Sequence, residues 1–383
     1  MRIGIFSAMV GRKAAGLESY ERSLIRALAK TDRENEYRIF CLTEEAAASF
    51  GIQQENFRFE PLWPGVRWIS FPLVLPFKVQ ATALNVLHAT FVPPIWGQTD
   101  TVCTVHDLGM FTNPEFYHPA LRWRMNGLIR KGVRQSRLVL CISDAVRDAV
   151  QDYFHVADSR VMTVHHGIDP IYRPQAPEHV QTVMRRYGLR SPYLIFVGQL
   201  RIGIKNLVRL LEAFAIFRRS EKDAQLVLVG RRPYKGRYPM AGFDETIQRL
   251  NLQSAVRELG YVSVEDLPAL YSGAEMLVFP SLCEGFGFPV LEAMACGTPV
   301  VASQIPALRE ISGGAALLVD PYSSEDIAAG MERMFYDQQL REKCCSKGLL
   351  RARSFTWEKA AEKTLAAYRQ ASGIPTKAQA ISA

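Results

Sequence analysis

Two carboxylates flank a glycine turn within residues 280–302. Glu284 precedes the turn formed by residues 285–288, and Glu292 follows it. An ionised carboxylate can accept two hydrogen bonds from a vicinal diol, such as the edge of a ribose or a hexose. Backbone N–H groups at the start of a helix favour an anion. Together these groups suit a ligand that combines sugar hydroxyls with a diphosphate, which is the chemistry of a nucleotide sugar.

The surrounding sequence predicts how these carboxylates are positioned. Residues 274–280 form an apolar run that predicts a strand ending at the turn, and Pro289 suits the first position of a helix that Gly297 ends. Residues 298–302 predict the next strand. Strand, helix and strand of this length make a parallel crossover unit, whose ligands bind at the carboxyl ends of the strands. We therefore expect both carboxylates to face a crevice.

A third strand end carries groups that suit a diphosphate leaving group. Gly198 ends a predicted strand, and Lys205 with Asn206 as N-cap opens the following helix, with Arg201 as the nearest second cation. Breaking a sugar–phosphate bond needs positive charge or oriented dipoles where the leaving oxygen becomes more negative. A lone Lys or Arg is more often a solvated surface charge. Its place after a strand and at a helix start favours a functional role for Lys205.

The first half of the chain offers two further candidates. His106 follows the apolar residues 101–105, at the carboxyl end of a predicted strand. A His within a core strand more often serves packing, whereas one at the rim suits a ligand contact. Asp107 either orients the imidazole or starts the next turn. Gly16, at the start of the first predicted helix, offers a backbone N–H group.

Strand-like runs and helical patterns alternate along the chain and predict two doubly wound α/β domains. We expect strands of the first half at residues 2–8, 37–42, 86–89, 101–105, 138–142 and 160–164. Residues 170–174 break regular structure and mark a linker. The alternation restarts at residues 193–197 and continues to Val319. A helical pattern then runs to about Gln370, and we expect the tail after Ser372 to be disordered.

Composition limits the class of protein. A chain of 383 residues with 48% hydrophobic and 22% charged residues suits two soluble domains. Seven cysteines without a Cys-x-x-Cys spacing predict reduced, buried thiols. The chain has neither a signal-peptide pattern nor an apolar run of about 18 residues. We expect a cytoplasmic protein, with a peripheral place on the inner face of the cytoplasmic membrane as an open alternative.

The formal charge of +8 has its sharpest local excess within residues 122–137. The basic residues of this segment are Arg122, Arg124, Arg130, Lys131, Arg134 and Arg137, with no acidic residue among them. The pattern predicts either a basic amphipathic helix on an anionic membrane or a core helix with a solvated face. Residues 61–77, rich in Trp and Phe, are a second candidate for contact with a membrane, although a segment of this kind more often forms a loop and part of the core. We expect no nucleic-acid partner, which would need a continuous basic stripe with stacking aromatics.

Residues 280–302 resemble the Glu-x7-Glu motif of the retaining glycosyltransferases of family 4, which have the GT-B fold. Thr-Val-His-Asp-Leu at residues 104–108, followed by Asn-Pro-Glu at residues 113–115, resembles the bacterial mannosyltransferase branch that builds O-antigen and exopolysaccharide. Further matches in the family's order are Ile142-Ser143, His166-Gly167-Ile168-Asp169, Phe196-Val197-Gly198, Lys205-Asn206 and Leu259-Gly260-Tyr261-Val262. The resemblance covers nearly the whole chain.

This resemblance implies two Rossmann-like parallel-sheet domains that face a central cleft. Residues 1–172 would form the acceptor domain, with a C-terminal helix at about 358–372 packing back on it, and residues 173–357 the nucleotide-sugar donor domain. The implied enzyme is a retaining hexosyltransferase that moves mannose from GDP-mannose to a glycan or lipid-linked acceptor in surface polysaccharide synthesis. It needs no cofactor, and we expect no metal because the chain lacks an Asp-x-Asp pair.

The resemblance also assigns residue roles. His106 would touch the transferred sugar, Lys205 the diphosphate, and Glu284 the sugar hydroxyls, as the catalytic groups. Glu292 would hold the ribose diol, and Val262 the base through its main chain. The remaining donor-binding residues are Gly16, Asp107, Arg201, Gly285, Phe286, Gly287 and Phe288. Around Arg201 the sequence departs from its relatives, with Gln199 and Ile204 in place of the family's usual residues.

Other functions stay open on sequence grounds. A UDP-sugar-dependent transferase or a nucleotide-sugar epimerase of the same fold would use the same groups. A dinucleotide-binding dehydrogenase is disfavoured because Gly11 and Gly16 do not match the Gly-x-Gly-x-x-Gly spacing. A catalytically silent binding protein is also disfavoured, since all the polar groups needed for donor chemistry are present.

Overall fold

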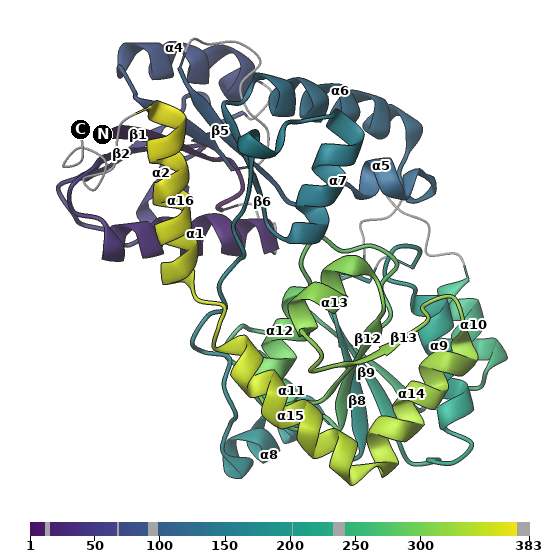
Figure 1. Cartoon of the computed structure of the whole chain (residues 1–383). Helices are drawn as coiled ribbons and strands as arrows, with labels where there is room; N and C mark the ends of the chain where they lie inside the picture. The colour runs from purple at the N-terminus through teal and green to yellow at the C-terminus, as the bar shows by residue number, and fades with distance from the viewer. Residues whose placement is uncertain (12–15, 67–68, 91–98, 201, 233–241, 374–383) are drawn as a thin grey trace. The chain divides into compact units, whose positions relative to one another are not determined.

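The chain forms two compact units, shown in Figure 1. The computed structural model describes residues 1–11, 16–66, 69–90, 99–200, 202–232 and 242–373. The first unit comprises Met1–Gly167 together with Phe355–Ala383, and the second comprises Ile168–Ser354. The sequence placed the two changes of domain after residues 172 and 357, whereas the structure has them after Gly167 and Ser354. The tail expected to be disordered lies outside the described residues, apart from Gly373.

The first unit is built on a seven-stranded parallel sheet in the order β3-β2-β1-β4-β5-β6-β7. Its strands are β1 (Arg2–Ser7), β2 (Glu36–Cys41), β3 (Phe57–Pro61), β4 (Val86–Ala89), β5 (Thr101–Val105), β6 (Leu138–Cys141) and β7 (Val161–Thr163). The central β1 pairs with β2 on one side and β4 on the other, so that Ile3 lies between Tyr37 and Val86. The predicted strands of the first half are confirmed, and β3 is an additional edge strand.

Helices cover both faces of this sheet. They are α1 (Gly16–Thr31), α2 (Glu44–Ala48), η1 (Ser70–Val74), α4 (Leu75–Ala81), α5 (Gly109–Thr112), η2 (Pro114–Phe116), α6 (Pro119–Gln135), α7 (Asp144–Phe154), η3 (Asp158–Arg160) and α16 (Trp357–Ser372). Right-handed crossovers place α4, α6 and α7 on one face and α1 and α2 on the other. The strand order reverses between β1 and β4, which is where ligands bind in open sheets of this kind.

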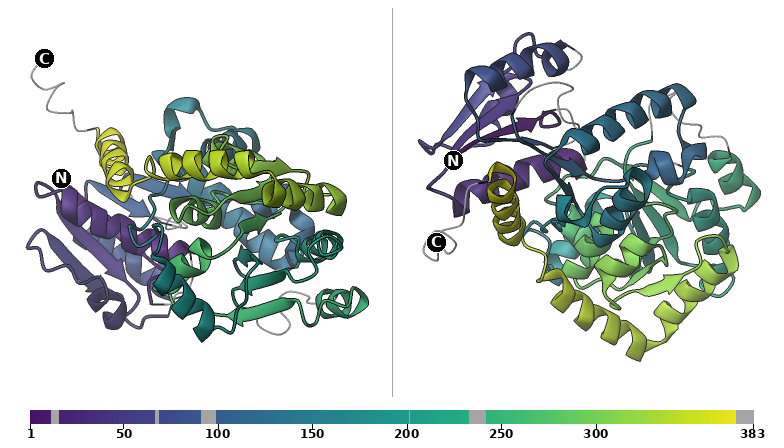
Figure 2. Two further views of the ribbon diagram at one scale, coloured as in Figure 1. Left: turned by 90° about the horizontal axis from the view of Figure 1, so that it is seen from below. Right: turned by 45° about the horizontal axis from the view of Figure 1, so that its top comes forward.

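The long helical pattern near the C-terminus forms α16, which completes the first unit. Thr356 caps it by accepting a hydrogen bond from the Lys359 N–H group at 3.2 Å. The helix packs against α1 and against β4, β5 and β6, and Figure 2 shows it beside α1. Its Tyr368 is fully buried. A segment far along the chain therefore supplies part of the first unit's core.

The second unit has a six-stranded parallel sheet in the order β10-β9-β8-β11-β12-β13. Its strands are β8 (Tyr193–Val197), β9 (Gln225–Val229), β10 (Val256–Gly260), β11 (Met276–Phe279), β12 (Val300–Ser303) and β13 (Leu317–Val319). Its helices are α8 (Pro177–Arg186), α9 (Leu207–Phe217), α10 (Phe243–Arg249), α11 (Leu267–Ser272), α12 (Phe288–Ala295), α13 (Pro306–Ser312), α14 (Ser324–Tyr336) and α15 (Gln338–Ala352). The strand order reverses between β8 and β11. The doubly wound prediction is confirmed for both halves.

Backbone approach at the ends of β8 and β9 requires glycine. Gly230 has φ +142°, and a Cβ atom built there would lie 1.8 Å from the carbonyl oxygen of Gly198. The N–H group of Gly198 donates to Val229 O at 2.9 Å, so the two strand ends are tied by their main chains. This contact sets the path of the loop that leads from β8 toward Lys205.

Residues 61–77 are only in part the core segment that the sequence favoured. Leu62 and Leu75 are buried in a cluster with Phe6, Phe40 and other apolar side chains. Trp63 and Phe77, however, are 86% and 63% exposed, because the first lies in a turn and the second on the outer side of α4. Trp68 lies outside the described residues.

The structure shows the state of the cysteines and the hydropathy of the helices. All seven cysteines are thiols rather than disulfides, and five of them are buried. Across the described residues, none of the helices combines the length and the hydropathy needed to cross a bilayer.

Candidate functional site

Lys205 and Glu284 pair at the point where the strand order of the second sheet reverses. Lys205 follows β8 and Glu284 follows β11, and the Lys205 Nζ donates a hydrogen bond to Glu284 Oε1. The side chains are 18% and 14% exposed. The ammonium also lies 5.2 Å from the centre of the Phe279 ring, a cation–π contact. The cation is thus held between a carboxylate and an aromatic face, within reach of solvent.

The two loops that carry this pair are tied together by the Asn206 side chain. Asn206 has the N-cap position of α9, as predicted, but its φ is +58° and its side chain makes no capping bond. Its Nδ2 instead donates to the carbonyl oxygens of Pro280 at 3.1 Å and Pro321 at 2.6 Å. The Leu282 N–H group donates to Ile204 O at 2.9 Å. The expected side-chain cap is wrong, because the amide serves as a link between strand ends.

The glycine turn opens α12 as the sequence predicts. Gly287 is the N-cap, with φ +101°, and a Cβ atom there would lie 2.4 Å from a Leu308 methyl group. Gly285 and Phe286 are buried, and the rings of Phe286 and Phe288 are 5.2 Å apart. Pro289 takes the second helical position, and the helix ends before Gly297, whose φ is +77°. The N–H groups at this helix start follow directly on Glu284.

Glu292 lies on α12 and is held by two tyrosines. The Tyr271 hydroxyl donates to Glu292 Oε2 at 2.8 Å, and the Tyr172 hydroxyl forms a second hydrogen bond. Burial raises the pKa of Glu292 to about 7, although both hydroxyl groups act to lower it. The group therefore titrates near neutral pH. No sequence spacing relates Tyr172, from the linker, to Tyr271 on α11, so sequence reasoning missed both partners.

The other predicted donor residues of the second unit lie at strand ends. Val262 follows β10 and is 7% exposed, whereas the neighbouring Tyr261 is 68% exposed. The Arg231 guanidinium, at the end of β9, lies 4.9 Å from the centre of the Tyr261 ring. Arg201 lies outside the described residues. The carboxyl edge of the second sheet thus carries Lys205, Glu284 and Val262 on three different loops.

In the first unit, His106 follows β5 as predicted. Its Nε2 lies 2.7 Å from the carbonyl oxygen of Thr90. Since a carbonyl oxygen only accepts, Nε2 carries the hydrogen and Nδ1 is left as an acceptor. Burial lowers the pKa of His106 to about 4, so the ring is neutral at pH 7. A neutral imidazole with Nδ1 as acceptor can receive a hydrogen bond from a sugar hydroxyl.

Asp107 starts the next turn, which was one of its two predicted roles. Its Oδ1 accepts a hydrogen bond from the Gly109 N–H group at 2.9 Å, at the beginning of α5. The imidazole of His106 is held by Thr90 and by the Tyr20 ring, whose centre lies 4.7 Å away in an edge-on arrangement. Gly16 is the exposed first residue of α1, next to residues 12–15, which lie outside the described part of the chain.

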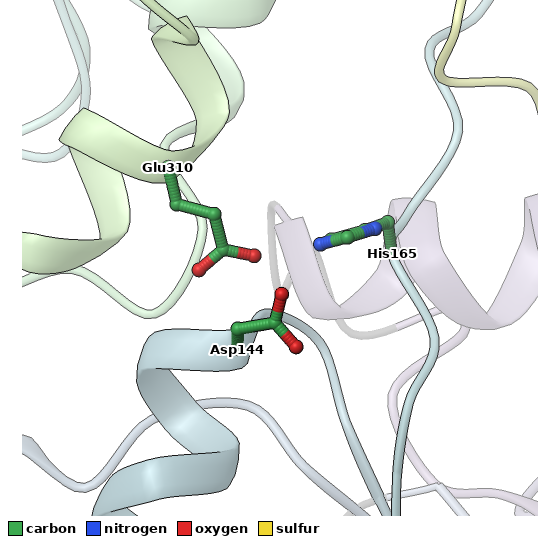
Figure 3. Close-up of side chains that lie close together, drawn as sticks. All are labelled: Asp144, His165 and Glu310. Atoms are coloured by element: carbon green, nitrogen blue, oxygen red, sulfur yellow. The ribbon is translucent and has the colours of Figure 1, made fainter.

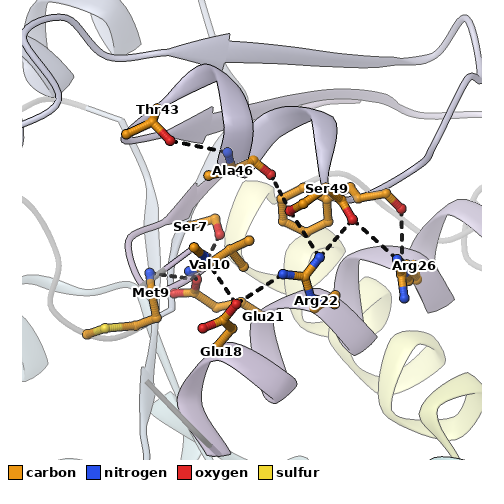
Figure 4. A network of polar contacts seen from close by, with 12 residues as sticks. Ser7, Met9, Val10, Glu18, Glu21, Arg22, Arg26, Thr43, Ala46 and Ser49 are labelled. Carbon is orange, nitrogen blue, oxygen red and sulfur yellow. Dashed lines mark hydrogen bonds and ion pairs between the residues drawn. The ribbon is translucent and has the colours of Figure 1, made fainter. Parts of the chain in front are cut away.

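A buried carboxylate that the sequence analysis did not single out lies beside this region (Figure 4). Glu21 of α1 accepts hydrogen bonds from the Ser7 hydroxyl and from the N–H groups of Met9 and Val10. It lies in the apolar stripe of α1, at helical spacing from Leu24 and Leu28. A carboxylate in an apolar stripe is the signal that could have identified it.

Asp144 and His165 lie close together at the carboxyl ends of β6 and β7 (Figure 3). Asp144 begins α7, and its Oδ1 accepts a hydrogen bond from the Thr163 hydroxyl at 2.7 Å and lies 3.0 Å from Arg147 Nη1. Glu310, drawn in the same picture, belongs to α13 of the second unit. Two ligands are fewer than a protein metal site usually has. We therefore assign Asp144 to the link between α7 and β7.

The chain matches two described protein families. Residues 14–171 match the family described as Glycosyltransferase Family 4, and residues 184–350 match the family described as Glycosyl transferases group 1. The O-antigen chain mannosyltransferase B of Escherichia coli is 34% identical to this chain over 271 residues, which cover 70% of each protein.

Solved structures with the same fold cover nearly the whole chain. Sucrose-phosphate synthase from Thermosynechococcus elongatus has a TM-score of 0.76 at 21% identity, over 97% of this chain and 98% of that one. Anabaena Alr3699/HepE in complex with UDP-glucose has a TM-score of 0.75 at 18% identity, over 96% and 100%. At this identity the likeness shows the fold, which is GT-B, and the sequence relatives show the family. The chain therefore belongs to the glycosyltransferases of family 4, in the mannosyltransferase branch, and is a hexosyltransferase.

Proposed function

We propose that this transferase moves mannose from GDP-mannose to a growing glycan or a lipid-linked acceptor in O-antigen or related surface polysaccharide synthesis. The observation that carries the proposal is the Lys205–Glu284 pair at the reversal point of the second sheet. It joins a phosphate-binding cation to a hydroxyl-binding carboxylate, which are the two chemistries of a nucleotide sugar. The similarity to an O-antigen chain mannosyltransferase supports mannose as the sugar.

The donor contacts follow from the geometry of the second unit. The Lys205 ammonium has three donors, one of which Glu284 takes, so two are left for diphosphate oxygens. The N–H groups at the start of α12 supply further positive potential. Glu284 then accepts from the sugar hydroxyls, and Glu292, held by Tyr271, accepts from the ribose diol. Val262 meets the base through its main chain.

We infer a retaining reaction by attack from the side of the leaving group. The bond between the anomeric carbon and the phosphate oxygen breaks, and its electron pair goes to the diphosphate. The acceptor oxygen bonds to the same face of that carbon, and its proton passes to the leaving phosphate oxygen. Lys205 and the start of α12 stabilise the developing charge, and His106 Nδ1 accepts from a sugar hydroxyl.

Product analysis tests donor, stereochemistry and reaction class together. Purified enzyme is incubated with a membrane lipid extract and radiolabelled GDP-mannose, UDP-glucose or UDP-N-acetylglucosamine. We expect label from GDP-mannose to enter the lipid fraction, with the product anomer, assigned by NMR, matching the donor. An inverted anomer would refute retention, and preferred transfer from a UDP-sugar would refute the donor. Conversion of the donor without any acceptor would favour the epimerase.

Metal independence is a separate part of the proposal. It rests on the lack of an Asp-x-Asp pair and on the cationic and dipolar groups described above. Turnover is expected to persist in excess EDTA. A reversible loss in EDTA, restored by Mg²⁺ or Mn²⁺, would show that a metal takes part.

We also propose that one face of the first unit contacts an anionic membrane. On α6, Trp123 is 83% exposed, and Arg124, Arg130, Lys131 and Arg134 are exposed, with no acidic residue in the helix. On the same face of the sheet, the outer side of the helical segment of η1 and α4 exposes Leu73 at 55% and Phe77 at 63%. Basic residues beside exposed aromatic and aliphatic side chains suit an interfacial helix.

Vesicle sedimentation tests this contact. We expect the enzyme to sediment with anionic vesicles at low salt and less with neutral ones, and Lys131→Glu with Arg134→Glu to weaken the binding. Phe77→Ser should weaken it without changing its dependence on salt. Lys30→Glu, on α1 at the opposite face, is the control for each charge reversal made singly. Equal recovery from neutral and anionic vesicles would contradict electrostatic docking.

A further inference from the structure

We propose that Glu21 is a positioning residue of this transferase. Its buried carboxyl ties the end of β1 to the end of β4 and, through Thr90, fixes the ring of His106. The inference rests on the proposed function in one respect, which is that His106 contacts the transferred sugar.

The first half of the link joins Glu21 to the loop after β1. Glu21 Oε2 accepts from the Ser7 hydroxyl at 2.7 Å and from the N–H groups of Met9 at 2.9 Å and Val10 at 3.2 Å, and Oε1 accepts from the Ala8 N–H group at 3.1 Å. Three successive N–H groups that point the same way would otherwise form an anion site. The carboxyl of Glu21 fills that site from within the protein, so these donors hold the loop rather than a ligand.

A second network holds the next residues of the same loop. Glu18 Oε1 accepts from the Gly11 N–H group at 3.1 Å and from Arg22 Nη2 at 3.0 Å, and Arg22 Nη1 donates to Ser49 O at 2.7 Å (Figure 4). The side chains of α1 thus set the path of residues 8–11, which lead to the start of the same helix at Gly16.

The second half of the link joins Glu21 to β4 through Thr90. Thr90 Oγ1 lies 2.5 Å from Glu21 Oε1 and 2.7 Å from the carbonyl oxygen of Phe6. The Thr90 hydroxyl donates its one hydrogen toward both oxygens, so it ties the Glu21 carboxyl to the main chain of β1. Glu21 is 1% exposed, and among the described residues no Lys or Arg pairs with it. Burial accordingly raises its pKa.

Thr90 is also the residue that holds His106. Its carbonyl oxygen accepts from His106 Nε2 at 2.7 Å, which selects the tautomer with Nδ1 as acceptor. The Thr90 side chain is bound by Glu21 and its main chain by His106. A shift of the Thr90 peptide would therefore move or rotate the imidazole.

The place of Glu21 in the fold argues for more than stability. It bridges β1 and β4, the two strands between which the order of the first sheet reverses, as Lys205 and Glu284 bridge β8 and β11 in the second sheet. An apolar residue at position 21 would extend the stripe of Leu24 and Leu28 without the cost of burying a carboxyl. The carboxyl instead aligns strand-end groups at the place where such sheets bind ligands.

Two pairs of variants test the proposal. Thr90→Ser keeps the hydroxyl, and Glu21→Gln keeps one oxygen for the Ser7, Met9 and Val10 donors and an amide nitrogen that can donate to Thr90 Oγ1, at the loss of the bond from the Ala8 N–H group. Glu21→Met and Thr90→Val remove the hydrogen-bonding groups at similar volume. We expect the conservative pair to keep kcat within about threefold and the other pair to lower it about 100-fold, the scale of a small misplacement of a reacting group. KM for the donor should change less than kcat. Arg26→Gln, which removes contacts of α1 with Ser49 and Phe50, is the stability control.

A second measurement reports on His106 without any substrate. The ring nitrogen chemical shifts of His106 are expected to show a single Nε2–H tautomer in the wild type, Glu21→Gln and Thr90→Ser. Glu21→Met and Thr90→Val should give a mixture of tautomers. If Glu21→Met does not fold, Thr90→Val breaks the same link from the other side.

The outcomes separate the positioning role from the proposed function. Wild-type kcat in Glu21→Met or Thr90→Val, or an unchanged His106 tautomer in both, would overturn the inference. If Arg26→Gln lost as much kcat as Glu21→Met at a matched Tm, the role of Glu21 would be structural only. If the wild type does not use GDP-mannose but the tautomer responds as expected, the proposed function fails and the positioning by Glu21 stands.

Discussion

Lys205 and Glu284 hold each other in surroundings that only partly exclude water. Lys205→Met is expected to lower kcat by roughly 100- to 1,000-fold, because the leaving diphosphate loses its cation. It should also lower the free energy of unfolding by about 1 to 3 kcal/mol, since Glu284 is left partly buried without its partner. Steady-state kinetics and urea unfolding measure the two effects.

The double variant Lys205→Met with Glu284→Gln separates these two effects. Removing both charges should recover much of the lost stability without restoring turnover. Near-normal turnover in Lys205→Met would remove this residue from the mechanism.

Glu292 predicts a pH dependence of the second unit. Its pKa in the folded protein is about 7, above the ordinary value of 4.5, so the folded state binds its proton more tightly than the unfolded state. The stability from this group is fully present below about pH 4.5 and is lost as the pH rises to about 7. The loss is at most about 3 kcal/mol. Glu292→Gln should abolish this part of the pH dependence and weaken donor binding about tenfold.

Tyr271→Phe is the matched control for Glu292. It removes a hydrogen bond that lowers the pKa of Glu292, so the loss of stability should extend to higher pH. Denaturant unfolding between pH 4 and 9 and calorimetric titration with the donor measure both effects. Donor binding by Glu292→Gln at wild-type affinity would contradict the ribose contact.

At the scale of elements, the close approach of the ends of β8 and β9 predicts a large loss of stability for any side chain at Gly230. The Cβ atom of Gly230→Ala would meet the Gly198 main chain, which cannot move without parting the two strand ends. We expect a loss of about 3 kcal/mol or more in the free energy of unfolding. Gly314→Ala is the control, because φ there is +77° but nothing lies within 4 Å, so only the backbone strain of about 1 kcal/mol applies. Equal losses in the two variants would contradict the importance of the close approach.

The elements that the sequence predicts well are those set by local chemistry. Gly287, Pro289 and Gly297 place the ends of α12 to within a residue or two, because helix starts and stops depend on backbone preferences of the chain itself. The strands come from short apolar runs bounded by breakers. Asn206 shows where local prediction fails. Its amide donates to the distant carbonyl oxygens of Pro280 and Pro321 and does not cap the helix that it begins.

In the candidate site, too, the position of a residue follows from local sequence, whereas its hydrogen-bond partner does not. The sequence predicts Glu284, Lys205 and His106 at strand ends, where the structure has them. Their partners come from other elements that no local pattern links to them, as with Tyr271 for Glu292 and Thr90 for His106. Partners of this kind are chosen by tertiary packing, which leaves no spacing in the sequence to detect.

At the scale of the molecule, the buried histidines make the first unit sensitive to acid. His88 is fully buried between Thr104 and Tyr368, at 2.7 Å from each hydroxyl, and burial lowers its pKa to about 3. The unfolded chain binds a proton below its ordinary pKa of 6.5 while the folded chain does not, so stability is lost as the pH falls below about 6.5. His88 alone should account for about 1.4 kcal/mol per pH unit.

Fluorescence can follow the first unit alone, because all five tryptophans belong to it. We expect the slope of unfolding free energy against pH between 4 and 6 to be smaller by about one proton in His88→Gln than in the wild type. The raised pKa of Glu21 acts in the opposite direction and cancels in this difference. His155→Asn, at an exposed helix end, is the control for the loss of a histidine that solvent reaches. The same slope in His88→Gln and the wild type would contradict a neutral buried His88.

The return of α16 to the first unit has a consequence for biosynthesis. The second unit ends at Ser354, whereas the first lacks the helix that carries Tyr368 until α16 has been translated. As the chain leaves the ribosome from its N-terminus, the unit that begins first is finished last. Until then the apolar side of α1 that α16 covers stays exposed, and this surface is the part of the nascent first unit that other chains can reach.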